Sequence, residues 1–363
     1  MSGFTKKTID KYIRNRIKYW IYDFGRNAHL YLKEQLSLST NEKDKLTDDD
    51  KQKIADFQRM IRDNIVVTGG CFTSMLQGDQ PNDLDVYLRS RESASLIAWF
   101  YLNKMMEKGN LKENSHVPTI EPQNTDDGIH IFIRSQGVSG EQIETDDYKY
   151  FEAYPEDAAD DFFKEYRKAV AKADLMNEKA YNVAFMTSNA ITLSNGIQII
   201  VRFTGDPETI HSNFDFIHAT NYWTWEQGVV YNQEALRATL EKRLYYFGSK
   251  FPVASIFRLR KFIERGWRIS AGEMLKIAYD VSHLNLDDVS VLRDQSLGMD
   301  SAYFGDVIAI LRKRSDKDID RTYLFQAIEQ AFNMADPQDS FLSNLSDNET
   351  DQEDVDLDLN SVD

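Results

Sequence analysis

The first sixty residues carry hydrophobic side chains at the spacing of α-helices. Between residues 8 and 36, apolar positions recur every three or four residues: Ile9, Tyr12, Ile13, Ile17, Trp20 and Ile21. This period predicts an amphipathic helix whose apolar stripe packs on the rest of the protein. The basic positions of the helix are expected to face water: Arg14, Arg16 and Lys18. Thr47, followed by three aspartates, predicts the capped start of a second helix that ends near Arg62.

The next part of the chain alternates between strand-like and helix-like patterns. The apolar run before Gly69, residues 83–89 and residues 129–133 read as strands, and residues 92–107 have the period of a helix. Farther on, Asn195-Gly196 separates two β-branched runs, which is the strongest short signal of a β-hairpin. This order predicts an α/β or α+β core. We expect an α+β fold with a mixed sheet and flanking helices, followed by a C-terminal helical domain.

The chain is expected to divide into four parts. Residues 1–63 form helices that pack on the core, 64–231 form the α/β domain, and 232–342 form the helical domain. Within the second part, residues 135–175 are acidic and aromatic without a clean period, which indicates an insertion or lid. Residues 343–363 are too poor in apolar side chains to fold by themselves and are expected to be disordered.

The charge of the chain is unevenly distributed. The formal net charge is −16 over 363 residues, and the acidic tail at 343–363 holds eight acidic residues and no basic one. Phosphate binding needs Lys and Arg, so this balance excludes a general nucleic-acid coat, although a local basic patch can bind a triphosphate or an RNA end. Cys71 is the sole cysteine, which excludes an intramolecular disulfide and favours a reducing cytosol.

Membrane insertion is not expected from the sequence. Charges interrupt the apolar positions of the N-terminus, which therefore lacks the hydrophobic stretch of a signal peptide. The sequence contains no run of about 18 apolar residues, which is the length that a helix needs to cross a bilayer. We therefore expect a soluble, cytoplasmic protein without membrane partners, and the sequence leaves its oligomeric state open.

The stretch from residue 66 to residue 88 holds the candidate chemistry. Asp83 and Asp85 alternate with apolar residues on the second strand, so their side chains share one face. Two adjacent carboxylates repel each other unless a cation lies between them, and a divalent metal is the natural cation. Gly69-Gly70 ends the preceding strand, where a backbone without Cβ atoms and the start of a helix can approach phosphates.

A strand ending in Gly-Gly, followed after twelve residues by Asp-Leu-Asp-Val, resembles the signature of the polymerase-β-type nucleotidyltransferase superfamily. Its members include CCA-adding enzymes, poly(A) polymerases, antibiotic adenylyltransferases and nucleotide second-messenger synthases. More weakly, the layout and the phrase NFDFIHATNYW are similar to uncharacterised nucleotidyltransferase-like proteins of bacteriophages. The resemblance implies a mixed sheet and an NTP substrate.

Nucleotidyl transfer explains why two aspartates stand together. A hydroxyl that attacks an α-phosphate builds negative charge, which two Mg²⁺ ions can neutralise; Mn²⁺ suits the same oxygen ligands. Asp83 and Asp85 are expected to hold both metals. Asp215, flanked by phenylalanines in a predicted strand, is the best candidate for a third acid, as metal ligand or general base, and Asp206 and Glu208 are its rivals.

Several further residues are candidates for nucleotide binding. Around the glycines and in the helical part they are Gly69, Gly70, Cys71, Thr73, Ser74, Ser249, Lys250 and Arg258. Cys71 departs from the superfamily, many of whose members have Gly-Ser here and use the serine hydroxyl on the triphosphate. Basic residues of the helical part are expected to line one side of a helix: Arg258, Lys261, Arg265 and Arg268.

His218 and the aromatic residues near it are expected to pack in the core or in loops rather than to act chemically. The aromatic residues are Tyr222, Trp223 and Trp225. They have the flat rings that stack on nucleobases, but a packing role is more common for each.

The first functional hypothesis is a Mg²⁺-dependent nucleotidyltransferase that moves NMP from an NTP to a hydroxyl. The acceptor can be RNA, a nucleotide, a small molecule or a protein. The second hypothesis is a catalytically silent protein that uses the same fold for binding or structure, for example in a phage virion. A third is a phosphohydrolase that uses the same carboxylates. If the chain comes from a phage, the host cytoplasm or the virion is its expected location.

Overall fold

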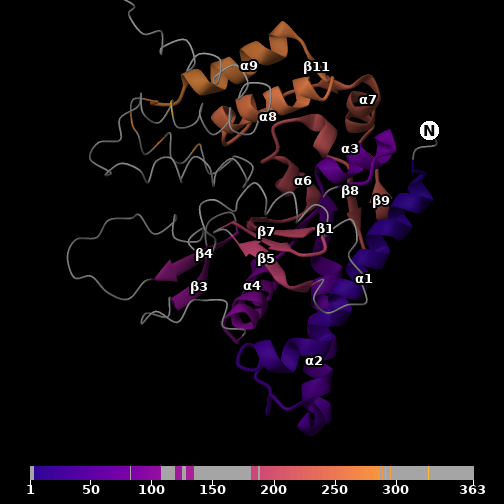
Figure 1. Ribbon diagram of the computed structural model, residues 1–363, viewed down its shortest axis with the longest axis vertical. Helices are drawn as coiled ribbons and strands as arrows, with labels where there is room; N and C mark the ends of the chain where they lie inside the picture. Colours follow the sequence, from indigo (N-terminus) through magenta and orange to yellow (C-terminus); the bar gives the residue numbers. More distant parts are fainter. Residues whose placement is uncertain are drawn as a thin grey trace, which may run out of the picture.

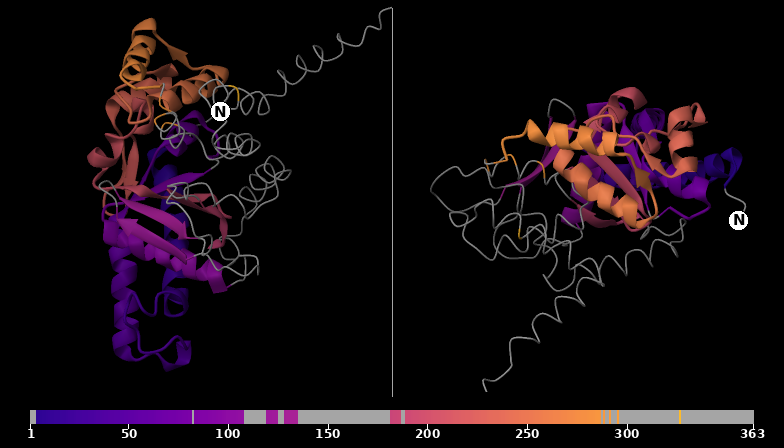
Figure 2. Two further views of the ribbon diagram at one scale, coloured as in Figure 1. Left: turned by 90° about the vertical axis from the view of Figure 1, so that its left-hand side faces the viewer. Right: turned by 90° about the horizontal axis from the view of Figure 1, so that it is seen from above.

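The computed structural model describes residues 4–81, 83–107, 119–124, 128–134, 181–186 and 189–286, together with positions 288, 291, 295 and 326. Figure 1 shows a mixed sheet at the centre, with α2 toward one end, α7, α8 and α9 toward the other, and α1 running along the side of the sheet between them. The left view in Figure 2 shows the same separation of the ends. The predicted acidic insertion at 135–175 and the predicted disordered tail at 343–363 lie outside the described residues.

The central sheet has seven strands in the order β5-β6-β7-β2-β1-β8-β9. Their bounds are β1 Ile65–Thr68, β2 Leu84–Leu88, β5 Val183–Met186, β6 Ala190–Leu193, β7 Ile197–Thr204, β8 Tyr222–Thr224 and β9 Gly228–Val230. The β2 and β7 strands are parallel, and the other neighbours are antiparallel. The predicted mixed sheet of an α+β protein is therefore confirmed.

Helices flank this sheet and continue beyond it. They are α1 Lys6–Tyr31, α2 Asp48–Asn64, α3 Gly70–Gln77, α4 Arg91–Glu107, α6 Pro207–His211, α7 Gln233–Glu241, α8 Pro252–Glu264 and α9 Ala271–Ser282, with 3-10 turns η1 Lys43–Lys45 and η5 Ile217–Ala219. Two small sheets pair β3 Thr119–Asn124 with β4 Ile129–Arg134, and β10 Arg243–Leu244 with β11 Arg268–Ile269. In the described part of the chain, no helix combines the length and apolar character that a bilayer span requires.

The two faces of the sheet have different surroundings. Alternate residues such as Val67, Val86 and Ile199 are fully buried in the main core together with side chains of α1 and α4. The opposite face carries a smaller cluster that includes Val66 and Tyr87 and is covered by α6. Because side chains alternate along a strand, Asp85 lies on the face of this smaller cluster.

The predicted N-terminal helix is confirmed, but two of its basic side chains are not solvated. Arg16 is buried, and its guanidinium donates to the Asn195 carbonyl oxygen at 2.7 Å. Arg14 is half-buried against the rings of Trp223 and Trp225, with centroids 5.3 and 5.0 Å away. The prediction of a wet basic face was wrong here because Arg14 packs against the β8–β9 turn and Arg16 bonds to the β6–β7 turn.

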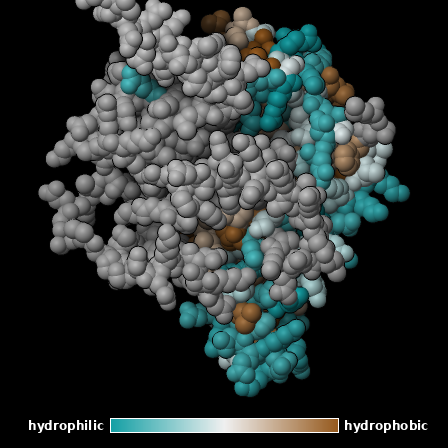
Figure 3. All heavy atoms as spheres, in the orientation of Figure 1, coloured by the Kyte–Doolittle hydropathy of each residue, from teal (hydrophilic) through white to brown (hydrophobic). Residues whose placement is uncertain are grey.

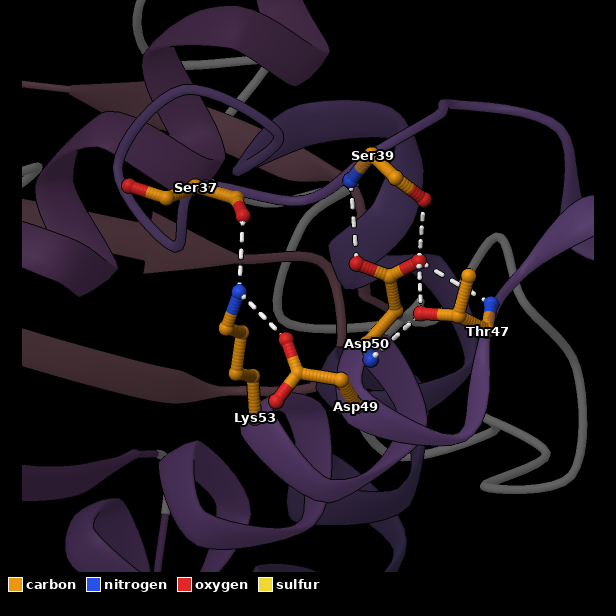
Figure 4. A network of polar contacts seen from close by, with 6 residues as sticks. All are labelled: Ser37, Ser39, Thr47, Asp49, Asp50 and Lys53. Atoms are coloured by element: carbon orange, nitrogen blue, oxygen red, sulfur yellow. Dashed lines mark hydrogen bonds and ion pairs between the residues drawn. The ribbon is translucent and has the colours of Figure 1, made fainter.

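The predicted cap of the second helix is confirmed. The Asp50 amide donates to Thr47 Oγ1 at 3.1 Å, and the Asp50 carboxylate accepts from the Thr47 amide at 3.0 Å, which completes a capping box. The amide and hydroxyl of Ser39 also donate to this carboxylate (Figure 4). Hydrogen bonds from Ser39, more than any other contact, lower the pKa of Asp50 far below its ordinary value. The network fixes the loop between α1 and α2.

The hairpin at Asn195-Gly196 is confirmed, with Gly196 at φ 83° between antiparallel β6 and β7. The predicted helical domain at 232–342 also contains two short strands. Lys242 adopts left-handed backbone and ends α7, and residues 243–244 then pair with 268–269 as strands.

The hydropathy surface in Figure 3 is mainly hydrophilic over α2, and hydrophobic atoms appear near α9, where Leu275 is 69% exposed.

Candidate active site

Gly69 joins the first strand of the motif to its helix. Its backbone has φ 94° and ψ −157°, a combination that is essentially restricted to glycine. A Cβ added at this position would lie 2.5 Å from Oδ2 of Asp85, so the carboxylate lies directly against the glycine backbone. The Gly69 amide donates to the Ala219 carbonyl at 3.1 Å, which holds the turn. The two halves of the sequence motif therefore meet in the fold, where the turn at Gly69 contacts Asp85.

The two aspartates of the motif stand at the start of β2. Asp85 pairs with Thr68 in the antiparallel register, and Asp83 lies exposed just before the strand. Asp85 is half-buried, and both carboxylates contribute to a raised pKa of the neighbouring Cys71 thiol, for which burial is the larger cause. Backbone N–H groups at the start of α3 begin one residue after Gly69. The Asp85 carboxylate and the first N–H groups of α3 thus lie on either side of Gly69.

Thr68 and His211 support this turn from the side of α6. The Thr68 hydroxyl lies 2.8 Å from the Asn221 carbonyl oxygen and 2.9 Å from His211 Nε2. A hydroxyl has one proton, so if Thr68 donates to the carbonyl, Nε2–H donates to Thr68. Burial lowers the pKa of His211 to about 4, against an opposing effect of Glu208. Sequence reasoning missed both residues, because only the packing of α6 brings His211 to the end of β1.

Asp215, the predicted third acid, lies in a different setting from the one expected. It is in a bend before the single bridge between Phe216 and Tyr246, and not in a strand. Its carboxylate is buried and forms an ion pair with Arg258 of α8. The expectation that a buried carboxylate here needs a partner is met by a guanidinium. The predicted phosphate ligand Arg258 and the predicted metal ligand Asp215 therefore hold each other.

The rival third acids lie at the start of α6. Asp206 is the N-cap residue and lies 3.4 Å from Arg89 Nε, with 69% of its side chain exposed. Glu208 is in the first turn of the same helix. Across the residues that the structure describes, no three His, Cys, Asp or Glu side chains gather closely enough to hold a metal ion.

The side chains that follow the glycines are directed to the protein itself. The Cys71 thiol is buried and donates to the Thr68 carbonyl at 3.6 Å. The Thr73 hydroxyl donates to the His218 carbonyl, and the Ser74 hydroxyl donates to the Gly70 carbonyl, both at 3.4 Å. The structure thus leaves the backbone of α3, rather than these three side chains, as the group best placed to meet a phosphate.

The predicted basic stripe is cut short: Arg258 and Lys261 lie on α8 and Arg265 is its C-cap residue, but Arg268 lies beyond the helix. The α8 helix ends at Glu264, Gly266 takes φ 78°, and Arg268 lies in β11. Ser249 Oγ accepts from the Phe251 amide at 3.0 Å, and Lys250 Nζ lies 5.5 Å from the centre of the Phe203 ring.

His218 packs in the core, as predicted. Its ring centre lies 4.6 Å from those of Phe262 and Trp267, and burial lowers its pKa to about 4. Trp223, which was also expected to pack, is fully buried, and its indole N–H donates to Asp10 at 2.8 Å.

The donor set fits one kind of metal binding. Mg²⁺ in proteins is usually bound by one or two carboxylates together with water and substrate phosphates. Asp83 and Asp85 would supply the carboxylates, and the space that a Cβ at Gly69 would fill lies beside Asp85. These residues therefore suit a metal that arrives with phosphates.

Comparisons with known proteins gave one family match and one distant structural match. The model of a family described as "Gabija anti-defense 2 family protein" matches residues 32–242. No curated protein matches the chain. A solved structure of the Thermotoga maritima CCA-adding enzyme complexed with tRNA is 11% identical, with a TM-score of 0.34. That match covers 72% of this chain and 50% of the other, so the chain spans about half of that enzyme's length.

Proposed function

The chain belongs to the Gabija anti-defense 2 family, and on this premise we propose that it opposes the Gabija defense by nucleotidyl transfer. In this proposal, NMP moves from an NTP to a hydroxyl of a Gabija component, an RNA, a nucleotide or another small molecule. Mg²⁺ is the expected metal, and Mn²⁺ can replace it. A phage origin and action in the host cytoplasm are parts of the same proposal.

One observation carries the proposal. Gly69 adopts a backbone that other residues rarely adopt, and its missing Cβ leaves room for the Asp85 carboxylate 2.5 Å from where that atom would lie. A carboxylate that lies against a glycine turn at a helix start is suited to act on one ligand together with the N–H groups of that helix. A triphosphate with its metal is such a ligand, because the metal meets the carboxylate while the phosphates meet the N–H groups.

The residues then have distinct tasks. Asp83 and Asp85 would hold the metal, which when bound would neutralise the charge that develops on the phosphates. Gly69 lets the backbone approach the phosphates, and the first turn of α3 offers N–H donors. The Thr68–His211 hydrogen bond keeps the end of β1 in place. The metal role of Asp215 stays a prediction, and it requires that Arg258 first leave the carboxylate.

The test is transfer of label from each α-labelled NTP, with Mg²⁺, to RNA or to purified Gabija proteins. We expect label in one acceptor, loss of label with EDTA, and loss in Asp85→Asn. Cells that carry Gabija should lose its protection when they express the wild-type chain, and they should keep it with Asp85→Asn. Complete absence of transfer to every acceptor, with no metal-dependent NTP binding, would refute the enzyme.

A catalytically silent binding protein is the second candidate. It is favoured by the ion pair of Asp215 with Arg258 and by the lack of a three-residue metal cluster in the described part of the chain. In that case Asp85→Asn would still abolish Gabija protection, and no acceptor would be labelled. Release of phosphate without labelling would instead indicate a phosphohydrolase.

A further inference from the structure

The strand beside the two aspartates carries a residue that the motif does not contain. The β7 strand pairs with β2 in parallel, and Gln198 is the register partner of Asp85. Ile197 and Ile199 are fully buried in the main core, whereas Gln198 is half-buried. Because side chains alternate along a strand, Gln198 points to the same face as Asp85. Neighbouring strands lie about 4.8 Å apart, so the amide reaches the surroundings of the carboxylate.

The next strand offers a second polar group on that face. Thr192 of β6 is the register partner of Gln198 and is 2% exposed. Among the described residues, its hydroxyl oxygen is one of the buried polar atoms without a hydrogen-bond partner. A buried hydroxyl without a partner is costly, so a group that bonds to it is expected when the site is in use. The Gln198 NH₂ is such a group, and bonding to Thr192 would turn the amide oxygen toward Asp85.

We infer that Gln198 is the third side chain of the Asp83–Asp85 site, and that this site binds a divalent metal together with a triphosphate rather than before it. The inference rests on the proposed function and specifies its ligand as a metal–NTP complex. An amide supplies an oxygen without a charge. The site therefore presents two negative charges to the metal, whereas a third carboxylate would make three. The phosphates of the NTP supply the remaining negative charge.

The proposed arrangement can be tested by metal binding alone. Free Mn²⁺ is measured by its electron paramagnetic resonance signal, with and without a non-hydrolysable NTP analogue. After correction for the Mn²⁺ that the analogue binds in the absence of protein, wild type should bind Mn²⁺ at least about tenfold more tightly with the analogue than without it. Gln198→Glu should raise the affinity for Mn²⁺ without the analogue about tenfold, the size expected for one added charge ~5 Å from a divalent ion in water. Gln227→Glu, in the exposed turn between β8 and β9, adds the same charge away from the site and should leave the affinity for Mn²⁺ unchanged.

The outcomes separate the inference from the proposed function. If Gln198→Glu binds Mn²⁺ no better than Gln227→Glu, or if wild type binds Mn²⁺ equally well without the analogue, the inference is wrong. If Gln198→Glu gains Mn²⁺ binding but no variant binds the analogue, the place of Gln198 beside the metal site is supported, whereas the metal–NTP part of the inference and nucleotidyl transfer are both refuted. Absence of Mn²⁺ binding in every variant and condition overturns both. Should Gln198→Glu not fold, Gln198→Leu adds no charge and is expected to weaken Mn²⁺–analogue binding several-fold; unchanged binding would overturn the inference.

Discussion

Substitution of Gly69 by alanine should separate the cost of the glycine turn from the ordinary effects of mutation. The φ 94°, ψ −157° backbone of Gly69 costs a residue with a side chain about 1–3 kcal/mol. The new Cβ would also lie 2.5 Å from Asp85 Oδ2. The end of a side chain can move away, so this contact should displace the carboxylate rather than unfold the protein. We expect a loss of about 1–3 kcal/mol of folding free energy, together with loss of metal–nucleotide binding.

Gly70 provides the matched control for stability. It is the first residue of α3, and nothing lies within 4 Å of a Cβ added there. Alanine at this position should be neutral or stabilising by up to about 1 kcal/mol, because helical backbone suits it. The two variants therefore differ in the backbone conformation and in the contact with Asp85.

The measurement is urea unfolding followed by tryptophan fluorescence, since Trp20 and Trp223 are fully buried and report the folded state. Equal stability of Gly69→Ala and wild type, within about 0.5 kcal/mol, would refute the argument from backbone strain. A Gly70→Ala variant as unstable as Gly69→Ala would show that the effect is not specific to the turn. A destabilised Gly69→Ala that still binds the metal–nucleotide complex normally would refute the link between the glycine and Asp85.

Three other predictions concern buried groups. Lys104 donates to Asp23 at 3.4 Å in the core, so Lys104→Met should cost about 3–5 kcal/mol in urea unfolding, and a second change, Asp23→Leu, should recover part of it. His218 is buried and neutral with a pKa of about 4, below its unfolded value of about 6.5. Its contribution is therefore complete above pH 6.5 and falls by about 3 kcal/mol as the pH drops toward 4; in urea titrations at several pH values, His218→Leu should lose this part of the dependence and keep the part due to His211. Cys71 is buried with a raised pKa, so Ellman's reagent should label it in urea and not in the folded protein; rapid labelling of the folded protein would contradict its placement.

The candidate site was predictable where its parts are neighbours in the chain. The strand, Gly69-Gly70, the helix and the second strand follow one another within residues 65–88, and local patterns identify them. The place of Asp85 on one face of β2 also follows from the period of a strand, whereas Asp83 lies just before the strand and its shared face with Asp85 stays a prediction. The same reasoning failed for Asp215, because a local pattern cannot show that Arg258, 43 positions away, reaches its carboxylate.

The sequence by itself determined the mixed α+β character, the capped α2 helix, the hairpin at Asn195-Gly196 and the glycine turn next to two aspartates. These features depend on residue period and on backbone preferences, which act over a few neighbouring residues. Only the tertiary structure decided what surrounds the aspartates: Gln198 beside Asp85, and His211 against Thr68. Strand pairing and helix packing join segments far apart in the chain, and their register depends on how the whole core is filled.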